Sequence, residues 1–126
     1  MPKTVAVVGA STDRRKYGNK AVRAYGKEGW KVFPIHPKAE EVEGHKAYPD
    51  LASVPEKIHR VSMYLPPGVG MQLLPEIARV QPEELFFNPG SESPELVAAA
   101  KAHGLNPIQA CSILSIGREP DEFVEE

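Results

Sequence analysis

Residues suited to binding phosphate gather near the start of the chain. Gly9-Ala10-Ser11 follows a run of β-branched residues, and a basic stretch, Arg14-Arg15-Lys16, comes soon after it. A glycine here permits a tight turn, the Ser11 hydroxyl can donate a hydrogen bond, and backbone amides that open a following helix can bind an anion. Cationic side chains add charge-assisted hydrogen bonds to phosphate oxygens. This stretch predicts a phosphate site; the alternative interpretation is an ordinary turn between a strand and a helix.

The turn does not match the dinucleotide fingerprint G-x-G-x-x-G. Ser11 stands at its third position and Arg14 at its sixth, and side chains there block the close backbone approach of a nicotinamide dinucleotide. An NAD site also places Asp or Glu near the end of the second strand. Here that tip reads Pro34-Ile35-His36-Pro37-Lys38, with no acid before Glu40. A basic tip favours a phosphorylated ribose, as in NADP or coenzyme A (CoA), unless Lys38 is simply an exposed loop lysine.

Other kinds of reactive site are not indicated. The sequence has no G-x-x-x-x-G-K-[ST] phosphate loop and no G-x-S-x-G nucleophile elbow. One cysteine and four separated histidines argue against a disulfide framework and a structural zinc site. We therefore expect no catalytic residues and no metal site. Cys111 has two interpretations, a small buried core residue or a reactive thiol at a ligand site.

The elements that must position these residues alternate along the chain. Residues 39–57 are predicted to be irregular, with a short helical turn near Leu51 to Val54, and Pro75 is predicted to kink its helix or lie in its first turn. Apolar runs and turn signals predict strands at residues 4–8, 31–35, 60–65, 84–87 and 107–110, and helices at residues 18–28, 69–80 and 94–104.

This alternation, without a hairpin signal, predicts a parallel sheet covered on both faces. We expect a Rossmann-like, doubly wound, five-stranded α/β fold in a single domain over residues 1–118, followed by an acidic tail over residues 119–126. Ligands of such sheets bind beyond the carboxyl ends of the strands. The loops that follow the strands therefore share one rim: residues 9–18, 34–38, 65–68, 88–91 and Cys111.

Composition and charge fit a protein that holds a small anion. The 126 residues are 41% hydrophobic and 25% charged, and no apolar run approaches the roughly 20 residues of a membrane span. The chain begins without the apolar core of a signal peptide, so we expect a cytoplasmic protein. Residues 1–38 carry nine basic and two acidic side chains, whereas the whole chain has a net charge of −2. This predicts a locally held anionic ligand, or a solvated helix face, rather than the broad basic face of a nucleic-acid binder.

A spaced set of motifs runs along the chain: Gly9-Ala10-Ser11, the basic loop to Lys16, Gly18-Asn19, Val32 to Lys38, Glu40 to Pro49, Leu65-Pro66-Pro67 and Gly104 to Cys111. This set resembles the small stand-alone CoA-binding proteins. The resemblance covers nearly the whole chain, and the set is more specific than any one motif. This family is similar to the CoA-binding domain of the succinyl-CoA synthetase α-subunit, which has a Rossmann-type fold.

The resemblance implies a role for particular positions. Gly9, Ala10, Ser11 and Lys16 would hold the phosphates of CoA. Pro34 and Lys38 would flank its adenosine and ribose phosphate, and Leu65-Pro66 would cover the other side of the nucleotide. The family commonly has Asn in place of His36 and Gln near Asn88. The remaining expected contacts are Thr12, Arg14, Gly18, Asn19, His36 and Asn88.

The resemblance also implies a function, a non-catalytic module that binds free or acylated CoA. The phosphorylated histidine and acyl transfer of the larger synthetase need a second domain, which these 126 residues do not contain. We expect CoA or acyl-CoA as ligand, and neither a nucleic acid nor a membrane as partner. The sequence is compatible with a protein partner or a homo-oligomer. The alternative function is an NADP-binding oxidoreductase or regulatory Rossmann protein. At the rim, Cys111 could meet the pantetheine end of CoA and form a mixed disulfide under oxidation.

Overall fold

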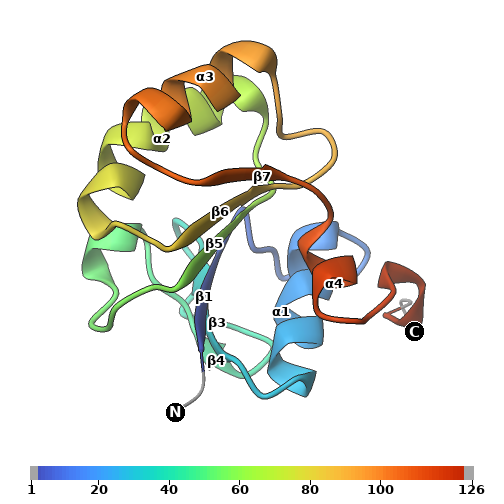
Figure 1. The fold of residues 1–126 in the computed structure, drawn as a ribbon. Helices are drawn as coiled ribbons and strands as arrows, with labels where there is room; N and C mark the ends of the chain where they lie inside the picture. Colours follow the sequence, from blue (N-terminus) through green and yellow to red (C-terminus); the bar gives the residue numbers. More distant parts are fainter. Residues whose placement is uncertain (1–2, 124–126) are drawn as a thin grey trace.

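Five parallel strands form the central sheet of the structure, a computed structural model that describes residues 3–123 (Figure 1). Their order across the sheet is β2-β1-β5-β6-β7. The chain adds β2 on one side of β1 and then crosses over to add β5, β6 and β7 on the other side. This confirms the predicted doubly wound sheet and places the switch point, where such folds bind ligands, beside β1. The strands are β1 (Thr4–Val8), β2 (Lys31–Ile35), β5 (Arg60–Met63), β6 (Glu84–Phe87) and β7 (Pro107–Gln109).

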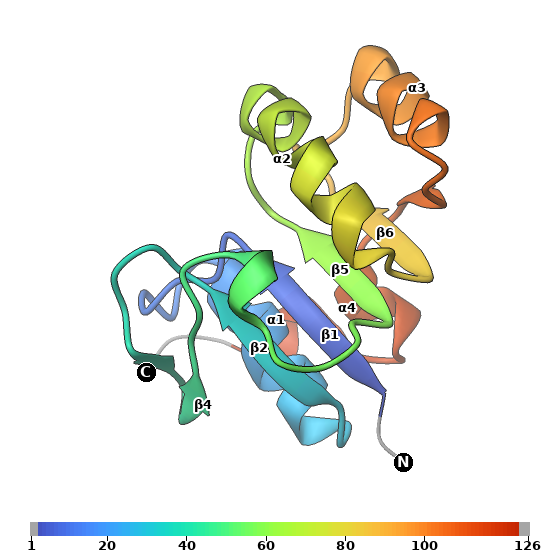
Figure 2. The ribbon, with the colours of Figure 1, turned by 90° about the vertical axis from the view of Figure 1, so that its left-hand side faces the viewer.

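Among the described residues, four helices cover the two faces of this sheet (Figures 1 and 2). Successive side chains of a strand point to opposite faces, and β1 shows this plainly: Val5 and Val7 pack with α1 and α4, whereas Ala6 and Val8 pack with α2 and α3. The apolar residues of both faces are buried, so the sheet has a core on each side. The helices are α1 (Tyr17–Lys27), α2 (Pro67–Val80), α3 (Pro94–Ala102) and α4 (Ser112–Ser115).

The structure differs from the sequence-based elements in three places. Within the irregular stretch, β3 (Glu41–Val42) and β4 (His45–Lys46) form a small antiparallel hairpin, because Glu43 and Gly44 both take positive φ, as a two-residue turn requires. The short helical turn is confirmed as the 3₁₀ helix η1 (Leu51–Ser53). Pro75 lies in the interior of α2 at an exposed position, which excludes the first-turn alternative, and the predicted kink stays a prediction. Helix α4 was not predicted, because four residues carry too little periodicity.

The acidic segment expected as a tail packs in part against the domain. The 3₁₀ helix η2 (Pro120–Glu122) leads to Phe123, whose ring is buried with the residues of α1. Arg23 of α1 donates a hydrogen bond to the carbonyl of Phe123 (3.2 Å). Residues 124–126 lie outside the described part, so the domain boundary at residue 118 stays a prediction. No described helix is long and apolar enough to span a membrane.

Candidate functional site

Two adjoining cavities lie beyond the carboxyl ends of the strands. Cavity 1, of about 650 Å³, is bounded by the ends of β1, β5 and β6 and by the start of α1. Cavity 2, of about 410 Å³, lies over the tips of β1 and β2 and against α2. Gly9, Lys16 and Leu65 line both cavities, so the two meet at the phosphate-binding turn. The predicted rim of loops is therefore where the structure has its concave surface.

The turn after β1 depends on two glycines. Gly9 has a φ of +94°, which side-chain-bearing residues rarely adopt. A Cβ on Gly18 would lie 2.2 Å from the carbonyl oxygen of Gly9, so α1 begins directly behind the turn. Close helix–strand packing is also the purpose of the last glycine in the dinucleotide fingerprint. Gly18 supplies it here at a different spacing.

The amino end of α1 faces cavity 1. Lys16 precedes the helix, Tyr17 and Gly18 open it, and all three line that cavity. The first turn of α1 holds no acidic residue that would offset the positive end of the helix dipole. A phosphate placed here would meet both backbone N–H groups and a lysine ammonium.

The side chain of Asn19 fixes the turn through hydrogen bonds. Its buried side chain donates hydrogen bonds to the carbonyl of Ser11 (2.9 Å) and to the Glu43 carboxylate (3.1 Å), and it accepts one from Arg23 (2.7 Å). These bonds use the whole amide within the protein. Asn19 therefore positions the turn, and the ligand contact expected of it stays a prediction.

Other side chains of the loop have distinct environments. The Ser11 hydroxyl accepts a bond from the Asp13 N–H (3.0 Å), so its own proton can point to a ligand in cavity 2. Arg15 hydrogen-bonds to the Asp13 carboxylate, which lowers the pKa of that group to about 2. Arg14 pairs with Glu43 (3.3 Å). Ala10 lines cavity 2, whereas Thr12 is exposed and lines neither cavity.

The tip of β2 is shaped by His36. Its Nδ1 accepts hydrogen bonds from the backbone N–H groups of Lys38 (3.0 Å) and Ala39 (2.9 Å), which leaves Nε2 to carry the ring proton. The oxygen of an Asn side chain makes bonds of this kind in turns, so the His36 ring fills the place that an Asn side chain could take. His36 lines cavity 2.

Two other residues of this tip lie farther from the cavities. Pro34 is buried within β2 and Lys38 is exposed after it, and neither is among the residues that line cavity 1 or cavity 2. The ammonium of a flexible lysine can still reach a phosphate outside the cavity mouth. Their expected contacts with adenosine and ribose phosphate stay predictions.

Asn88 lines cavity 1 but uses its amide inside the protein. Its Nδ2 donates to the Ser62 hydroxyl (3.0 Å) and the Met63 carbonyl (2.8 Å), and its Oδ1 accepts from the backbone N–H of Ser112 (2.8 Å). The side chain is only 1% exposed. Asn88 thus fixes the start of α4, next to Cys111, against β5.

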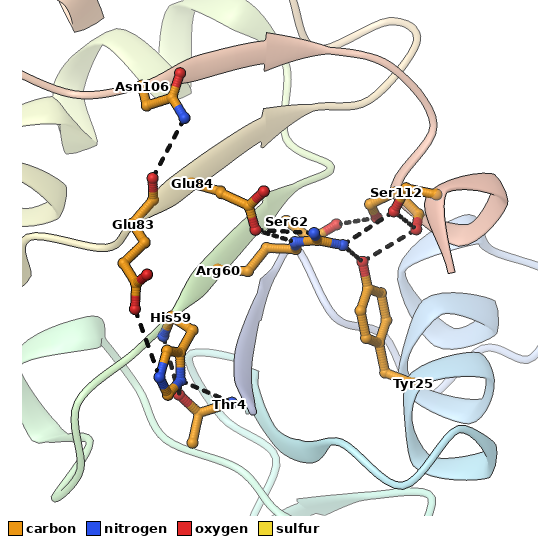
Figure 3. Close-up of polar contacts among 10 residues, drawn as sticks. Thr4, Tyr25, His59, Arg60, Ser62, Glu83, Glu84, Asn106 and Ser112 are labelled. Carbon is orange, nitrogen blue, oxygen red and sulfur yellow. Dashed lines mark hydrogen bonds and ion pairs between the residues drawn. The ribbon is translucent and has the colours of Figure 1, made fainter. Parts of the chain in front are cut away.

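A buried polar network extends from this point along the sheet (Figure 3). The Tyr25 hydroxyl donates to the Ser112 carbonyl (3.0 Å) and accepts from Arg60 (3.1 Å), whose guanidinium pairs with Glu84 (2.8 Å). The same guanidinium lies near the rings of Trp30 and Phe86. Burial alone would lower the pKa of Arg60, but the bonds with Tyr25 and Glu84 outweigh it and raise that pKa. The network therefore anchors α4, and with it one wall of cavity 1.

A second polar set at the opposite end of the sheet contains Thr4, His59 and Glu83 (Figure 3). His59 lies between the Thr4 hydroxyl (3.0 Å) and the Glu83 carboxylate (3.5 Å). The Thr4 hydroxyl donates to the Lys57 carbonyl, and Thr4 is only 4% exposed. The set therefore ties the starts of β1 and β5 together rather than presenting a nucleophile.

Several cavity residues were not foreseen from the sequence. Tyr64 lines cavity 1, and burial raises the pKa of its phenol, so this group stays neutral. Val69, Leu73 and Glu76 line cavity 2 from α2. Their i, i+4, i+7 spacing marks one helix face and is the signal that could have identified them. Pro66 and Leu65, which were foreseen, complete the mouth of cavity 1.

Known proteins resemble part of this chain in sequence. The acetate–CoA ligase (ADP-forming) II subunit alpha of Pyrococcus furiosus is 35% identical over 78 residues, 60% of this chain. The acetate–CoA ligase (ADP-forming) I of Archaeoglobus fulgidus is 30% identical over 62% of this chain. The matched part spans only 17% and 11% of these two relatives.

Solved structures resemble it in fold. A conserved hypothetical protein from Pyrococcus furiosus has a TM-score of 0.80 at 29% identity, covering 91% of this chain and 99% of its own. The apo dinucleotide-forming acetyl-coenzyme A synthetase 1 of Ca. Korarchaeum cryptofilum has a TM-score of 0.75 at 27% identity, covering 86% of this chain but 26% of its own. The family described as CoA binding domain matches residues 3–117. This confirms the resemblance inferred from the motifs, and the chain belongs to the CoA binding domain family.

Proposed function

We propose that this protein binds coenzyme A, free or acylated, without catalysing a reaction on it. The observation that carries the proposal is the meeting of two cavities at Gly9 and Lys16, where the amino end of α1 can hold a pyrophosphate. CoA has a nucleotide on one side of its pyrophosphate and a pantetheine arm on the other. Cavity 2 would take the nucleotide, and cavity 1 would take the arm.

The lining of cavity 1 suits a pantetheine arm. Tyr17, Tyr64, Leu65 and Pro66 give it a largely apolar wall, and Cys111 lies at its α4 side. The arm is flexible and mostly apolar, with two amides and a terminal thiol or thioester. The two relatives are named as acetate–CoA ligases, and this supports CoA as the ligand.

The proposal of a non-catalytic role has its own support. No described residue that lines the two cavities takes part in a hydrogen-bonded nucleophile–base pair. Among residues 3–123 there is also no cluster of three side chains able to hold a metal ion. The ligase activity of the relatives belongs to much longer chains.

Calorimetric titration with CoA, acetyl-CoA, NADP and NAD tests the proposal. We expect CoA and acetyl-CoA to bind, NADP to bind more weakly and NAD not to bind. Lys16→Ala should weaken CoA binding, whereas Lys101→Ala, an exposed lysine on α3, should not. NADP binding as tight as CoA binding would favour the oxidoreductase or regulatory alternative. Release of free CoA from acetyl-CoA by the protein would contradict the non-catalytic role.

A further inference from the structure

One end of cavity 2 carries a carboxylate that the phosphate site does not need. Val69, Leu73 and Glu76 line this cavity along one face of α2. Helix α2 begins at the rim and runs back along the sheet, so Glu76 lies about 10 Å farther from the rim than Val69, at the usual rise per residue. Leu51 and Asp50 line the same cavity. Glu76 is thus well separated from the turn at Gly9.

The two carboxylates here differ in how they are used. Oδ1 of Asp50 accepts hydrogen bonds from both the backbone N–H (2.9 Å) and the hydroxyl (2.6 Å) of Ser53, as the cap of η1. Glu76 accepts the N–H of Ala52 through Oε2 (3.2 Å). No described residue donates a hydrogen bond to Oε1 of Glu76. That oxygen is therefore an available acceptor on a half-buried side chain in the cavity wall.

A nucleotide would enter cavity 2 in a fixed direction. Its pyrophosphate belongs at Gly9 and Lys16, where the cavities meet, so its ribose follows and its base lies farthest from the turn. Leu51, which precedes the Ala52 that bonds to Glu76, and Leu73 of α2 give that part of the cavity apolar walls, which suit the faces of a flat base. The polar edge of the base then meets Glu76.

We propose that Glu76 determines the base specificity of the site: its Oε1 accepts a hydrogen bond from the exocyclic amino group of adenine. This deepens the proposed function and rests on it. An ionised carboxylate only accepts hydrogen bonds. A base without an exocyclic amino group and without a proton on N1 offers this oxygen no donor and leaves it unpaired, and such losses are strongly discriminated.

The test compares CoA with an analogue in which unsubstituted purine, which has no amino group and no proton on N1, replaces adenine. The wild-type protein should bind CoA about 10- to 100-fold more tightly, as for a hydrogen bond to a charged group. In Glu76→Gln the amide can accept or donate, so the preference should fall to about threefold or less. Glu95→Gln changes an exposed carboxylate on α3 and should keep the wild-type preference.

The outcomes separate this inference from the proposed function. If wild-type protein binds CoA and the purine analogue equally well, Glu76 does not determine the base specificity, although CoA binding stands. A Glu76→Gln variant that keeps the wild-type preference and the wild-type melting temperature also overturns the inference. If neither ligand binds the wild-type protein, it is the proposed function that fails.

Discussion

Gly18 of α1 lies against the carbonyl of Gly9 with no room for a side chain between them. A Cβ on Gly18 would approach that oxygen to 2.2 Å, well inside any real contact distance. The oxygen belongs to the backbone of the turn, so it cannot rotate away as a side chain would. The position of the phosphate-binding turn and the start of α1 are therefore coupled.

Gly18→Ala should separate the helix from the turn. We expect a loss of about 3 kcal/mol or more in the free energy of unfolding, since an overpacked buried site must move backbone, and a loss of CoA binding. Gly68→Ala is the matched control, because Gly68 has open space around its Cβ position. Urea unfolding and calorimetric titration measure both effects. Equal stability for the two variants would contradict the coupling.

Lys16 and Lys38 should serve different phosphates of CoA. Lys16 lies where the cavities meet and should act on the pyrophosphate, whereas Lys38 follows the tip of β2 and should act on the ribose phosphate. Lys38→Ala should weaken CoA about tenfold or more, the effect of one charge-assisted contact, and leave dephospho-CoA nearly unchanged. Lys16→Ala should weaken both ligands.

Salt and ligand choice test this division. The losses of CoA affinity in Lys16→Ala and Lys38→Ala should both become smaller as ionic strength rises, because the rim is open to solvent. An equal effect of Lys38→Ala on CoA and dephospho-CoA would show that Lys38 does not contact the ribose phosphate. Titrations at two salt concentrations are sufficient to decide between these results.

Asn88→Asp should destabilise the protein before any ligand is added. The carboxylate cannot donate to Ser62 or to the Met63 carbonyl, and it would be a buried charge beside that carbonyl. We expect a loss of at least about 2 kcal/mol in the free energy of unfolding. Asn106→Asp, at an exposed position, should cost little. Unchanged stability of Asn88→Asp would show that its amide serves the ligand instead.

The rim of the site could be predicted because its signals are local. β-branched runs and the glycines and prolines that follow them mark strand ends, and parallel strands bring those ends together. The roles of Asn19 and Asn88 could not be predicted from the sequence, because their hydrogen-bond partners lie in distant segments. The far end of cavity 2 combines Leu51 with Glu76, which only tertiary packing brings together. The hairpin at β3 and β4 has strands too short to show alternation.

Burial of Tyr64 makes the stability sensitive to alkaline pH. The pKa of its phenol is raised in the folded protein, so the unfolded chain ionises first, near pH 10. The stability that the neutral, buried Tyr64 phenol contributes is therefore fully present below pH 10. As the pH rises above 10, the free energy of unfolding of the wild-type protein falls. Relative to Tyr64→Phe, the wild-type protein should lose about 1.4 kcal/mol at pH 11.

The control for this titration is Tyr17→Phe. Tyr17 is 57% exposed, so removal of its hydroxyl leaves the burial of Tyr64 unchanged, and the variant should follow the wild-type pH profile. Denaturant unfolding at pH 8, 10 and 11 gives the comparison. If Tyr64→Phe loses stability with pH as steeply as the wild type, the Tyr64 phenol is not shielded from solvent.

Cys111 provides a reporter for the pantetheine arm. It is the only cysteine of the chain, it is half-buried, and it lines cavity 1. Alkylation by iodoacetamide should therefore modify one site, and bound CoA should slow it severalfold by filling cavity 1. The nucleotide half alone, 3′-phosphoadenosine 5′-diphosphate, should occupy cavity 2 and leave the rate unchanged. Equal protection by both ligands would place the arm outside cavity 1.

CoA disulfide should then form a mixed disulfide at Cys111. The Cys111 thiolate attacks one sulfur of the CoA disulfide, the new S–S bond joins Cys111 to one CoA, and the other CoA leaves as its thiol. The reaction needs the end of the arm to reach the α4 side of cavity 1, where Asn88 fixes the backbone of Ser112. Intact-mass measurement should find one CoA added to the wild-type protein and none to Cys111→Ser, and dithiothreitol should remove it. If the wild-type protein stays unmodified while it still binds CoA, the thiol of the ligand does not reach Cys111.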